Sequence, residues 1–229
     1  MNDIRIEDLL DLNETIAADL FRDKTYPWEV LEDLSDFICA LGKTLDPVVY
    51  EQRGENIWVA KSAKVFDSAY LGAPLIVDEE AEIRHCAFIR GSAIVGKHAV
   101  VGNSVELKNV VLFNGVQVPH YNYVGDSVLG YKAHMGAGSI TSNVKADKKD
   151  VIIRDLSDPD SERIATGRKK VGAILGDYVD VGCNTVLNPG VVVGRNTNIY
   201  PVSMVRGVIS ADSIYKDKDH IITKQSDKS

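Results

Sequence analysis

Arg90 and Lys108 are two cationic residues that stand 18 positions apart in a stretch rich in short aliphatic residues. If three short strands and three corners, about 18 residues, make one coil of the chain, the two side chains lie on the same edge of successive coils. Two aligned cations repel each other unless an anion bridges them, so this spacing indicates a phosphate site. The alternative is that one of the cations pairs with Glu106 or with another surface acid.

A candidate general base follows in the stretch VPHYNYVGDS, which contains His120 and Tyr123. The stretch lies at a point where the spacing of the aliphatic residues slips. Histidine can take up a proton near neutral pH, so His120 is a candidate base for a reaction on an anionic substrate. A single histidine is more often an ordinary surface residue, but the adjacent tyrosine and the upstream cations favour a function.

A repeat of six residues predicts the elements that position these side chains. A short strand followed by a tight corner fits this period, and three such units close one triangular coil. The residue after the aliphatic position is Gly in nine cases, and we expect Gly to supply the unusual backbone angles of the corner. The sequence thus predicts a mainly β fold, a left-handed parallel β-helix of hexapeptide repeats, which departs from the usual right-handed crossover. The aliphatic positions are Val59, Val65, Leu71, Val77, Ile83, Ile89, Val95, Val101, Leu107, Leu112, Val118, Val124, Leu129, Met135, Leu175, Val181, Leu187, Val193, Ile199 and Val205.

The first 46 residues differ from the rest in charge, because they hold 12 of the 33 acidic residues but only 4 of the 26 basic ones. Apolar residues at helical spacing over residues 4–21 and 27–41 predict two helices, the second ending at Gly42. We expect residues 1–46 to form a helical hairpin that packs on the next domain or on a neighbouring subunit. Residues 47–215 then form the β-helix domain.

The β-helix has one interruption and a polar end. Residues 142–170 are polar and charged, and the stretches DVIIR and ERIAT predict a hairpin that turns at Asp158-Pro159-Asp160. Residues 216–229 predict a frayed polar tail.

Composition excludes several classes of protein. The formal charge of −7 argues against nucleic acid and anionic membranes as partners. No apolar run approaches the roughly 20 residues that span a bilayer, and the amino terminus lacks the pattern of a signal peptide. The three widely spaced cysteines are typical of reduced thiols, so we expect a cytoplasmic protein.

Metal binding is a competing use of the histidines, because hexapeptide folds include zinc carbonic anhydrases. His85, His98, His120 and His134 all lie within the repeat. A carbonic anhydrase site needs a close pair of histidines about five residues apart, and position 125 is Gly125. Ligands from neighbouring subunits are the remaining alternative. We expect no metal.

Residues 90–144 resemble the acetyltransferase domain of the bifunctional bacterial N-acetylglucosamine-1-phosphate uridyltransferase and glucosamine-1-phosphate acetyltransferase. The resemblance rests on the stretches IRGSAIVGKHAVVGNSVELKN, VPHYNYVGDSVLG and MGAGSITSN. Residues 168–194 resemble the later coils of that domain, including archaeal sugar-phosphate versions with a comparable insertion. The likeness covers about residues 57–210, and nothing in the chain resembles the uridyltransferase half.

The resemblance implies roles for five residues. His120 matches the catalytic base of the family. Arg90, Lys108 and Tyr123 match residues that contact the sugar phosphate. Asn143 matches the residue that orients the acetyl thioester of the cofactor and the amine of the substrate.

The same resemblance implies a second set of contacts. Lys149 matches a further lysine of the substrate site, and His134 stands where the family has an asparagine in that site. Ala137, Cys183 and Pro201 match positions that line the acetyl-CoA groove. In the family this site lies between subunits of a homotrimer.

Three hypotheses for the function follow. The first is acetyl transfer from acetyl-CoA to the amine of an amino-sugar 1-phosphate, a reaction that requires no metal. The second is a non-catalytic trimeric module that binds a sugar phosphate or sugar nucleotide. The third, which the sequence favours least, is a metalloenzyme like the γ-type carbonic anhydrases. The basic run Arg168-Lys169-Lys170 either meets a phosphate of CoA or belongs to a solvated loop.

Overall fold

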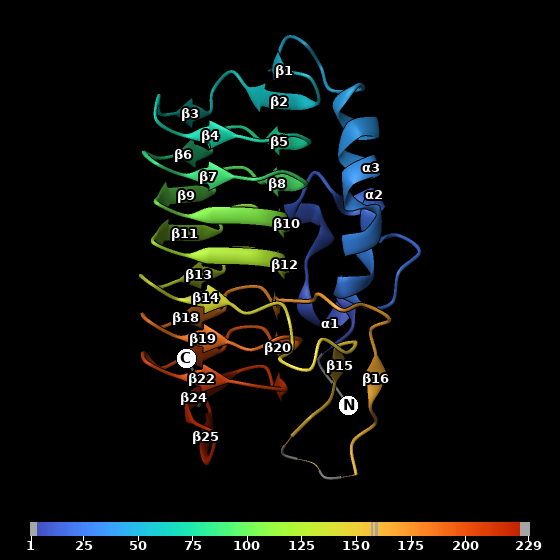
Figure 1. The fold of residues 1–229 in the computed structure, drawn as a ribbon, viewed down its shortest axis with the longest axis vertical. Helices are drawn as coiled ribbons and strands as arrows, with labels where there is room; N and C mark the ends of the chain where they lie inside the picture. Colours follow the sequence, from blue (N-terminus) through green and yellow to red (C-terminus); the bar gives the residue numbers. More distant parts are fainter. Residues whose placement is uncertain (1–3, 157, 159, 225–229) are drawn as a thin grey trace, which may run out of the picture.

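The chain forms a stack of triangular coils in a computed structural model that describes residues 4–156, 158 and 160–224 (Figure 1). The fold is a left-handed parallel β-helix of about nine turns, as the repeat predicts. Each coil pairs with the next along three faces, and the long strands β10 (Glu106–Leu112) and β12 (Tyr123–Leu129) each take part in two of them.

Short parallel strands make up the three faces. The helix-covered face, on which the amino-terminal segment packs, consists of β2 (Ile57–Ala60), β5 (Leu75–Val77), β8 (Ala93–Val95), the second halves of β10 and β12, β17 (Ala173–Leu175), β20 (Val191–Val193) and β23 (Val208–Ile209). The open face consists of β4 (Tyr70–Leu71), β7 (Phe88–Ile89), the first halves of β10 and β12, β14 (Ile140–Thr141), β19 (Val186–Leu187) and β22 (Met204–Val205). The polar face consists of β3 (Lys64–Val65), β6 (Glu82–Ile83), β9 (Val100–Asn103), β11 (Gln117–His120), β13 (His134–Met135), β18 (Asp180–Val181), β21 (Asn198–Ile199) and β24 (Ser213–Asp217).

Antiparallel strands close both ends of the stack. β1 (Tyr50–Gly54) pairs with β2 at one end, and β25 (His220–Thr223) pairs with β24 at the other. The expectation of a frayed tail from residue 216 is therefore wrong for residues 216–223, because β24 and β25 form a hairpin on the last coil. Residues 225–229 of the expected tail lie outside the described part of the chain.

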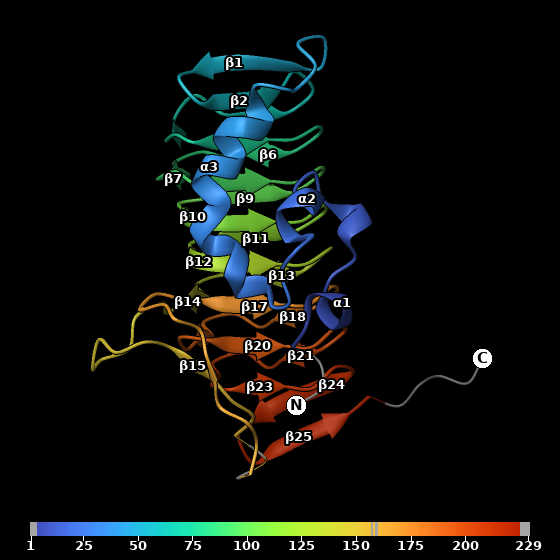
Figure 2. The same ribbon diagram turned by 90° about the vertical axis from the view of Figure 1, so that its right-hand side faces the viewer.

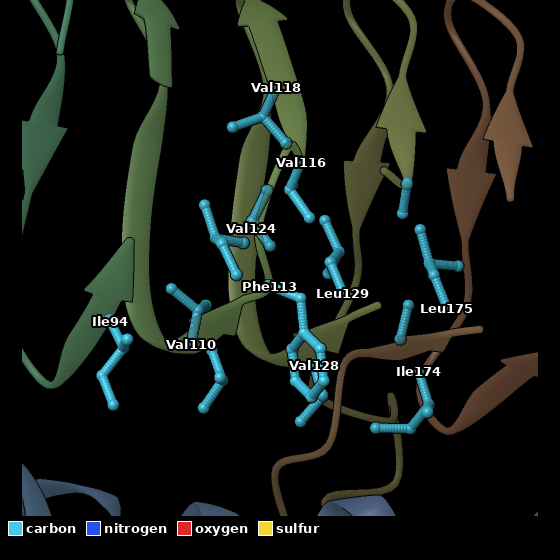
Figure 3. Close-up of a cluster of buried hydrophobic side chains, with 14 of the residues drawn as sticks. Ile94, Val110, Phe113, Val116, Val118, Val124, Val128, Leu129, Ile174 and Leu175 are labelled. Atoms are coloured by element: carbon cyan, nitrogen blue, oxygen red, sulfur yellow. The ribbon is translucent and has the colours of Figure 1, made fainter. Parts of the chain in front are cut away.

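The amino-terminal segment packs on its own β-helix. It contains α1 (Ile6–Leu9), η1 (Leu12–Glu14), α2 (Ala18–Phe21), η2 (Pro27–Glu29) and α3 (Val30–Gly42), and α3 runs along the stack against β5, β8 and β10 (Figure 2). In the strands of this face a row of residues that includes Ile76, Ile94 and Val128 points away from the prism, and these residues are nevertheless fully buried because the segment packs on β5, β8, β10 and β12. Figure 3 shows Ile94, Val128 and Ile174 of this row on the side where the segment lies.

The predicted second helix is present, but the predicted continuous helix over residues 4–21 is wrong. The segment is broken between Leu9 and Ala18, where Leu10 and Thr15 are extended. Contacts with the β-helix explain the break. The backbone N–H of Asp11 donates to the buried carboxylate of Asp177, and the Asp177 N–H donates to the Leu9 carbonyl. These tertiary hydrogen bonds outweigh local helix propensity.

The expected role of the repeat glycines at the corners is also wrong. None of the nine has a positive φ, and 16 described residues other than glycine adopt positive φ instead, among them Ser92, His98 and Ser104. Eight of the nine are required because the backbone of the next coil passes close to them, and Gly125 lies instead against the side chain of Tyr123. A Cβ on Gly96 would lie 2.7 Å from the carbonyl carbon of Phe113, and one on Gly102 would overlap the Pro119 carbonyl.

The insertion forms the predicted hairpin. β15 (Ile152–Ile153) pairs antiparallel with β16 (Ile164–Ala165), and the expected turn includes Pro159, which lies outside the described residues. Among the described residues, no helix combines the length and the apolar character needed to cross a membrane.

Because successive coils approach closely at Gly102 but not at Gly54, we expect alanine to destabilise the protein at the first position and not at the second. Gly102→Ala should lower the free energy of unfolding by about 1–3 kcal/mol, because the new methyl group meets rigid backbone. Gly54→Ala is the matched control, since its nearest neighbour is the flexible end of Ile57 at 3.3 Å. Urea unfolding of both variants measures the difference, and equal stabilities would contradict this explanation of the repeat.

Candidate functional site

A slip in the repeat builds one corner of the stack. β10 and β12 continue from the open face into the helix-covered face without a break, because five positions rather than six separate Leu107 from Leu112. Asn109 and Asp126 turn this corner with φ of 56° and 48°. Lys108 lies opposite Gly125 in the register of the two strands. The departure from the six-residue period therefore coincides with a group of polar side chains, which we call the Asp126 corner.

The carboxylate of Asp126 organises this corner. Its side chain is only 2% exposed, and both of its oxygens accept hydrogen bonds from Lys108 Nζ, at 3.0 and 3.1 Å. Asn109 Nδ2 donates to Oδ1 at 2.9 Å, and Asn143 Nδ2 donates to Oδ2 at 2.6 Å. A buried carboxylate needs such partners, and in return it fixes the positions of the three side chains that contact it.

Asp126 is a site residue that the sequence reasoning missed. The available signal was its place directly after Gly125, in the coil that follows Lys108. The acid can turn the corner because aspartate tolerates the left-handed backbone region better than most residues do.

Arg90 lies one coil before Lys108, as the 18-residue spacing predicts, since Ile89 pairs with Leu107. The structure shows the alternative in which an acid neutralises each cation. Arg90 Nη1 donates to Glu106 Oε1 at 2.8 Å, and this hydrogen bond raises the pKa of Arg90. Both partners of that pair are partly exposed, in contrast to buried Asp126.

Tyr123 lies next to the same corner. Its hydroxyl accepts a hydrogen bond from Asn143 Nδ2 at 3.2 Å and occupies space that a Cβ on Gly125 would fill. Burial raises the pKa of Tyr123, and the nearby charge of Asp126 raises it further. The hydroxyl therefore keeps its proton at neutral pH and can donate it in a hydrogen bond to a ligand.

His120 lies on the other edge of the open face. It ends β11, it is exposed, and its ring has no hydrogen-bond partner among the described residues. Its carbonyl accepts from Gly138 N–H at 3.0 Å, and in the next coils the Ala137 and Cys183 carbonyls accept from Asn184 and Val202.

The predicted cofactor positions therefore share an edge with the predicted base. His120, Ala137, Cys183 and Pro201 occupy one corner in successive coils, which we call the His120 edge. Only the stretch Tyr123–Gly125, about 10 Å of extended strand, separates this edge from the Asp126 corner.

Two predicted site residues lie away from the Asp126 corner. His134 is on the polar face, where its Nδ1 is 2.7 Å from Asp180 Oδ1. Lys149 is exposed within the insertion, and its backbone N–H donates to Asp147. Within one chain, the structure does not bring either side chain to Lys108 or Asn143.

The amino-terminal segment borders the Asp126 corner, which the sequence reasoning did not foresee. Asn109 Nδ2 donates to the Leu31 carbonyl at 3.2 Å, and Arg168 at the end of the insertion is 3.5 Å from Glu32 of α3. A shallow cavity of about 480 Å³ lies between these elements, and it is lined by more cations than acids: Lys108, Arg168, Lys169 and Lys170 against Glu32 and Asp126.

The described residues contain no group of three or more His, Cys, Asp or Glu side chains that could hold a metal ion. Cys39, Cys86 and Cys183 are free.

The repeat and the fold define a hexapeptide-repeat protein of the left-handed parallel β-helix class. Residues 71–199, more than half of the chain, match the family model described as the GMPPB C-terminal domain, and the chain belongs to that family.

Curated relatives resemble nearly all of the chain. It is 29% identical over 208 residues to a bifunctional sugar-1-phosphate nucleotidylyltransferase/acetyltransferase of Sulfurisphaera tokodaii, covering 83% of this chain and 47% of the relative. It is 27% identical over 226 residues to a bifunctional protein GlmU of Methanococcus maripaludis, covering 96% of this chain and 54% of the relative. The chain thus spans about half the length of these relatives.

Solved structures are similar at lower identity. A hexapeptide transferase family protein from Anaplasma phagocytophilum is 13% identical, with a TM-score of 0.37, over 74% of this chain and 80% of that one. A mutant of AntD, an N-acyltransferase from Bacillus cereus, is 15% identical, with a TM-score of 0.34, over 81% of this chain and 90% of that one.

Because Asp126 is buried and Glu106 is partly exposed, we expect substitution of Asp126 to lower stability more than substitution of Glu106. Asp126→Asn should lower the free energy of unfolding by about 2 kcal/mol, because it removes the charge that Lys108 pairs with and keeps a residue suited to positive φ. Glu106→Gln breaks a partly exposed pair and should cost clearly less. Urea unfolding compares the two, and an equal loss would show that Asp126 does not organise the corner.

Proposed function

We propose that the protein transfers an acetyl group from acetyl-CoA to the amine of an amino-sugar 1-phosphate. The observation that carries the proposal is the Asp126 corner, where one buried carboxylate holds Lys108 and Asn143 beside Tyr123. These three residues are among those to which the family resemblance assigns the sugar phosphate and the reacting groups. The name of the relative from Sulfurisphaera tokodaii, a sugar-1-phosphate nucleotidylyltransferase/acetyltransferase, supports the same class of reaction.

The phosphate of the substrate binds at the corner in this proposal. Arg90 and Lys108 lie on one edge in successive coils, and Arg168 lines the same cavity as Lys108. A phosphate dianion competes with Glu106 and Asp126 for these cations and can form two hydrogen bonds to the guanidinium of Arg90. The exposed pair of Arg90 with Glu106 is the easier one to exchange.

His120 then acts as the general base. Its exposed ring takes the proton from the substrate amine as the nitrogen attacks the thioester carbonyl carbon. The new N–C bond forms, the C–S bond breaks, and the thiolate of CoA leaves and takes up the proton from His120. A backbone N–H stabilises the oxyanion, and Asn143 orients the amine and the thioester. Ala137, Cys183 and Pro201 contact acetyl-CoA along the His120 edge.

A thiol-release assay tests the reaction. We expect release of CoA with glucosamine 1-phosphate or galactosamine 1-phosphate, and much less with unphosphorylated glucosamine, because that sugar offers Arg90 and Lys108 no phosphate to bind. His120→Asn should lower kcat at least about 100-fold.

The control for this variant is His98→Asn, since His98 is an exposed histidine at a different corner. An unchanged rate in His120→Asn would refute the assigned base. Binding of the sugar phosphate without any release of thiol would favour the non-catalytic binding module instead.

The open face supports a homotrimer as part of the proposal. Tyr70, Phe88 and Met204 project from it with 60%, 43% and 60% of their surfaces exposed, and the rings of Tyr70 and Phe88 are 5.4 Å apart. Burial of these side chains against a second copy would remove apolar surface from water. In this proposal His134 and Lys149 belong to the site of a neighbouring subunit.

Light scattering measures the assembly, and we expect three times the mass of one chain. Phe88→Glu places a charge on the open face and should shift the protein toward smaller species. Gln117→Glu adds the same charge to an exposed position of the polar face and should leave the mass unchanged. A wild-type protein with the mass of one chain would refute this part of the proposal.

A further inference from the structure

The insertion is fixed against the later coils by two glycines. Gly190 and Gly207 lie at one corner of successive coils with φ of 76° and 75°. A Cβ on Gly190 would lie 3.0 Å from Ile153, and one on Gly207 would lie 2.8 Å from Leu156. Ile153 is fully buried in this contact. The insertion thus has a defined position, and the residues between its anchors are held in place.

A cavity of about 640 Å³ lies between the insertion and these coils. Its volume falls within the range of small-molecule sites. Part of its lining is apolar and comes from the insertion and its start, with Val144, Ile152 and Leu156. The cavity begins at Ser142, the residue before Asn143 of the Asp126 corner.

The charged residues of this cavity do not balance. Its described lining residues include three cations, Lys145, Arg154 and Arg206, and one acid, Asp147. Asp147 is already engaged, because it accepts from the Lys149 N–H at 3.1 Å and lies 3.4 Å from Lys145 Nζ.

The two arginines lack counter-ions among the described residues. Arg154 Nε is buried without a hydrogen-bond partner, and neither Arg154 nor the exposed Arg206 forms an ion pair with a described carboxylate. Two guanidinium groups beside one carboxylate that is already engaged leave the lining with an excess of positive charge, so the lining is complementary to an anion.

We propose that this cavity binds the phosphoryl group of a phosphorylated organic molecule. The guanidinium groups of Arg154 and Arg206 bind the phosphate oxygens, for which their planar geometry is suited. Val144, Ile152 and Leu156 contact the carbon skeleton attached to the phosphate. The phosphate belongs either to the far end of CoA, whose thioester end reacts near Asn143, or to a separate phosphorylated ligand.

Isothermal titration calorimetry of the full chain tests the proposal without turnover, so its outcome is independent of the acetyl-transfer proposal. The probes are CoA, 3′-dephospho-CoA, UDP and inorganic pyrophosphate. If CoA binds more tightly than 3′-dephospho-CoA, and UDP and pyrophosphate do not bind, the phosphate is that of the co-substrate. Binding of UDP or pyrophosphate assigns it to a separate ligand.

Variants locate the binding. Arg154→Gln combined with Arg206→Gln should weaken the Kd of the bound probe at least about tenfold, the loss expected for hydrogen bonds to a charged group. Arg206→Gln alone should give part of this loss, and because Arg206 is exposed this variant leaves the packing of the insertion intact. Arg163→Gln is the control, since Arg163 is an exposed arginine of the same insertion that does not line the cavity.

The proposal is overturned if none of the four probes binds the wild-type protein. It is equally overturned if both arginine variants bind as tightly as the wild type and as Arg163→Gln. If the arginine variants bind as tightly as the wild type and thiol release persists, only the assignment of this cavity has failed.

Discussion

Hydrogen bonding between successive coils is the constraint on which the rest of this molecule depends. Parallel pairing holds neighbouring strands about 4.8 Å apart, so every corner must let the backbone of the next coil pass within that distance. Glycine follows the aliphatic position because a Cβ there would overlap this backbone, as at Gly96 and Gly102. The same spacing aligns side chains along the axis, so residues one coil apart in sequence form rows on one edge. The Asp126 corner and the His120 edge are two such rows.

The fold could be predicted because each coil repeats the same requirement. The pattern of aliphatic residues predicts a prism whose interior is filled in the same way in every coil. The alignment of Arg90 with Lys108 follows from their spacing of 18 residues, one coil. Asp126 could not be found in this way, since its role depends on burial and on a slip of the repeat. The roles of the glycines were misjudged for a related reason, because a sequence does not show how closely another coil approaches.

Long-range contacts account for the remaining differences. The first predicted helix is broken because Asp177, more than 160 positions away, accepts a hydrogen bond from Asp11. The polar stretch after residue 213 forms a hairpin because the last coil offers an unpaired strand edge, which any chain end of suitable length can cover. In both cases the local sequence pattern does not reveal the distant partner. His134 and Lys149 illustrate the same limit, because their distance from Asn143 depends on the path of the chain around the prism.

The insertion leaves and re-enters the stack at one corner, and the strand register shows what this implies. Ile140 pairs with Val186, 46 positions later, although Leu107 and Val124 pair across only 17. The coils before and after the excursion are therefore neighbours in the stack, and the number of residues between them has no effect on their pairing. A change in length within residues 142–170 leaves the strand pairing between all coils in register. The loss of one residue from a coil would shift the register of that coil against its neighbours. The scaffold and the excursion can consequently diverge at different rates, and relatives with the same coils can differ in what they hold at this corner.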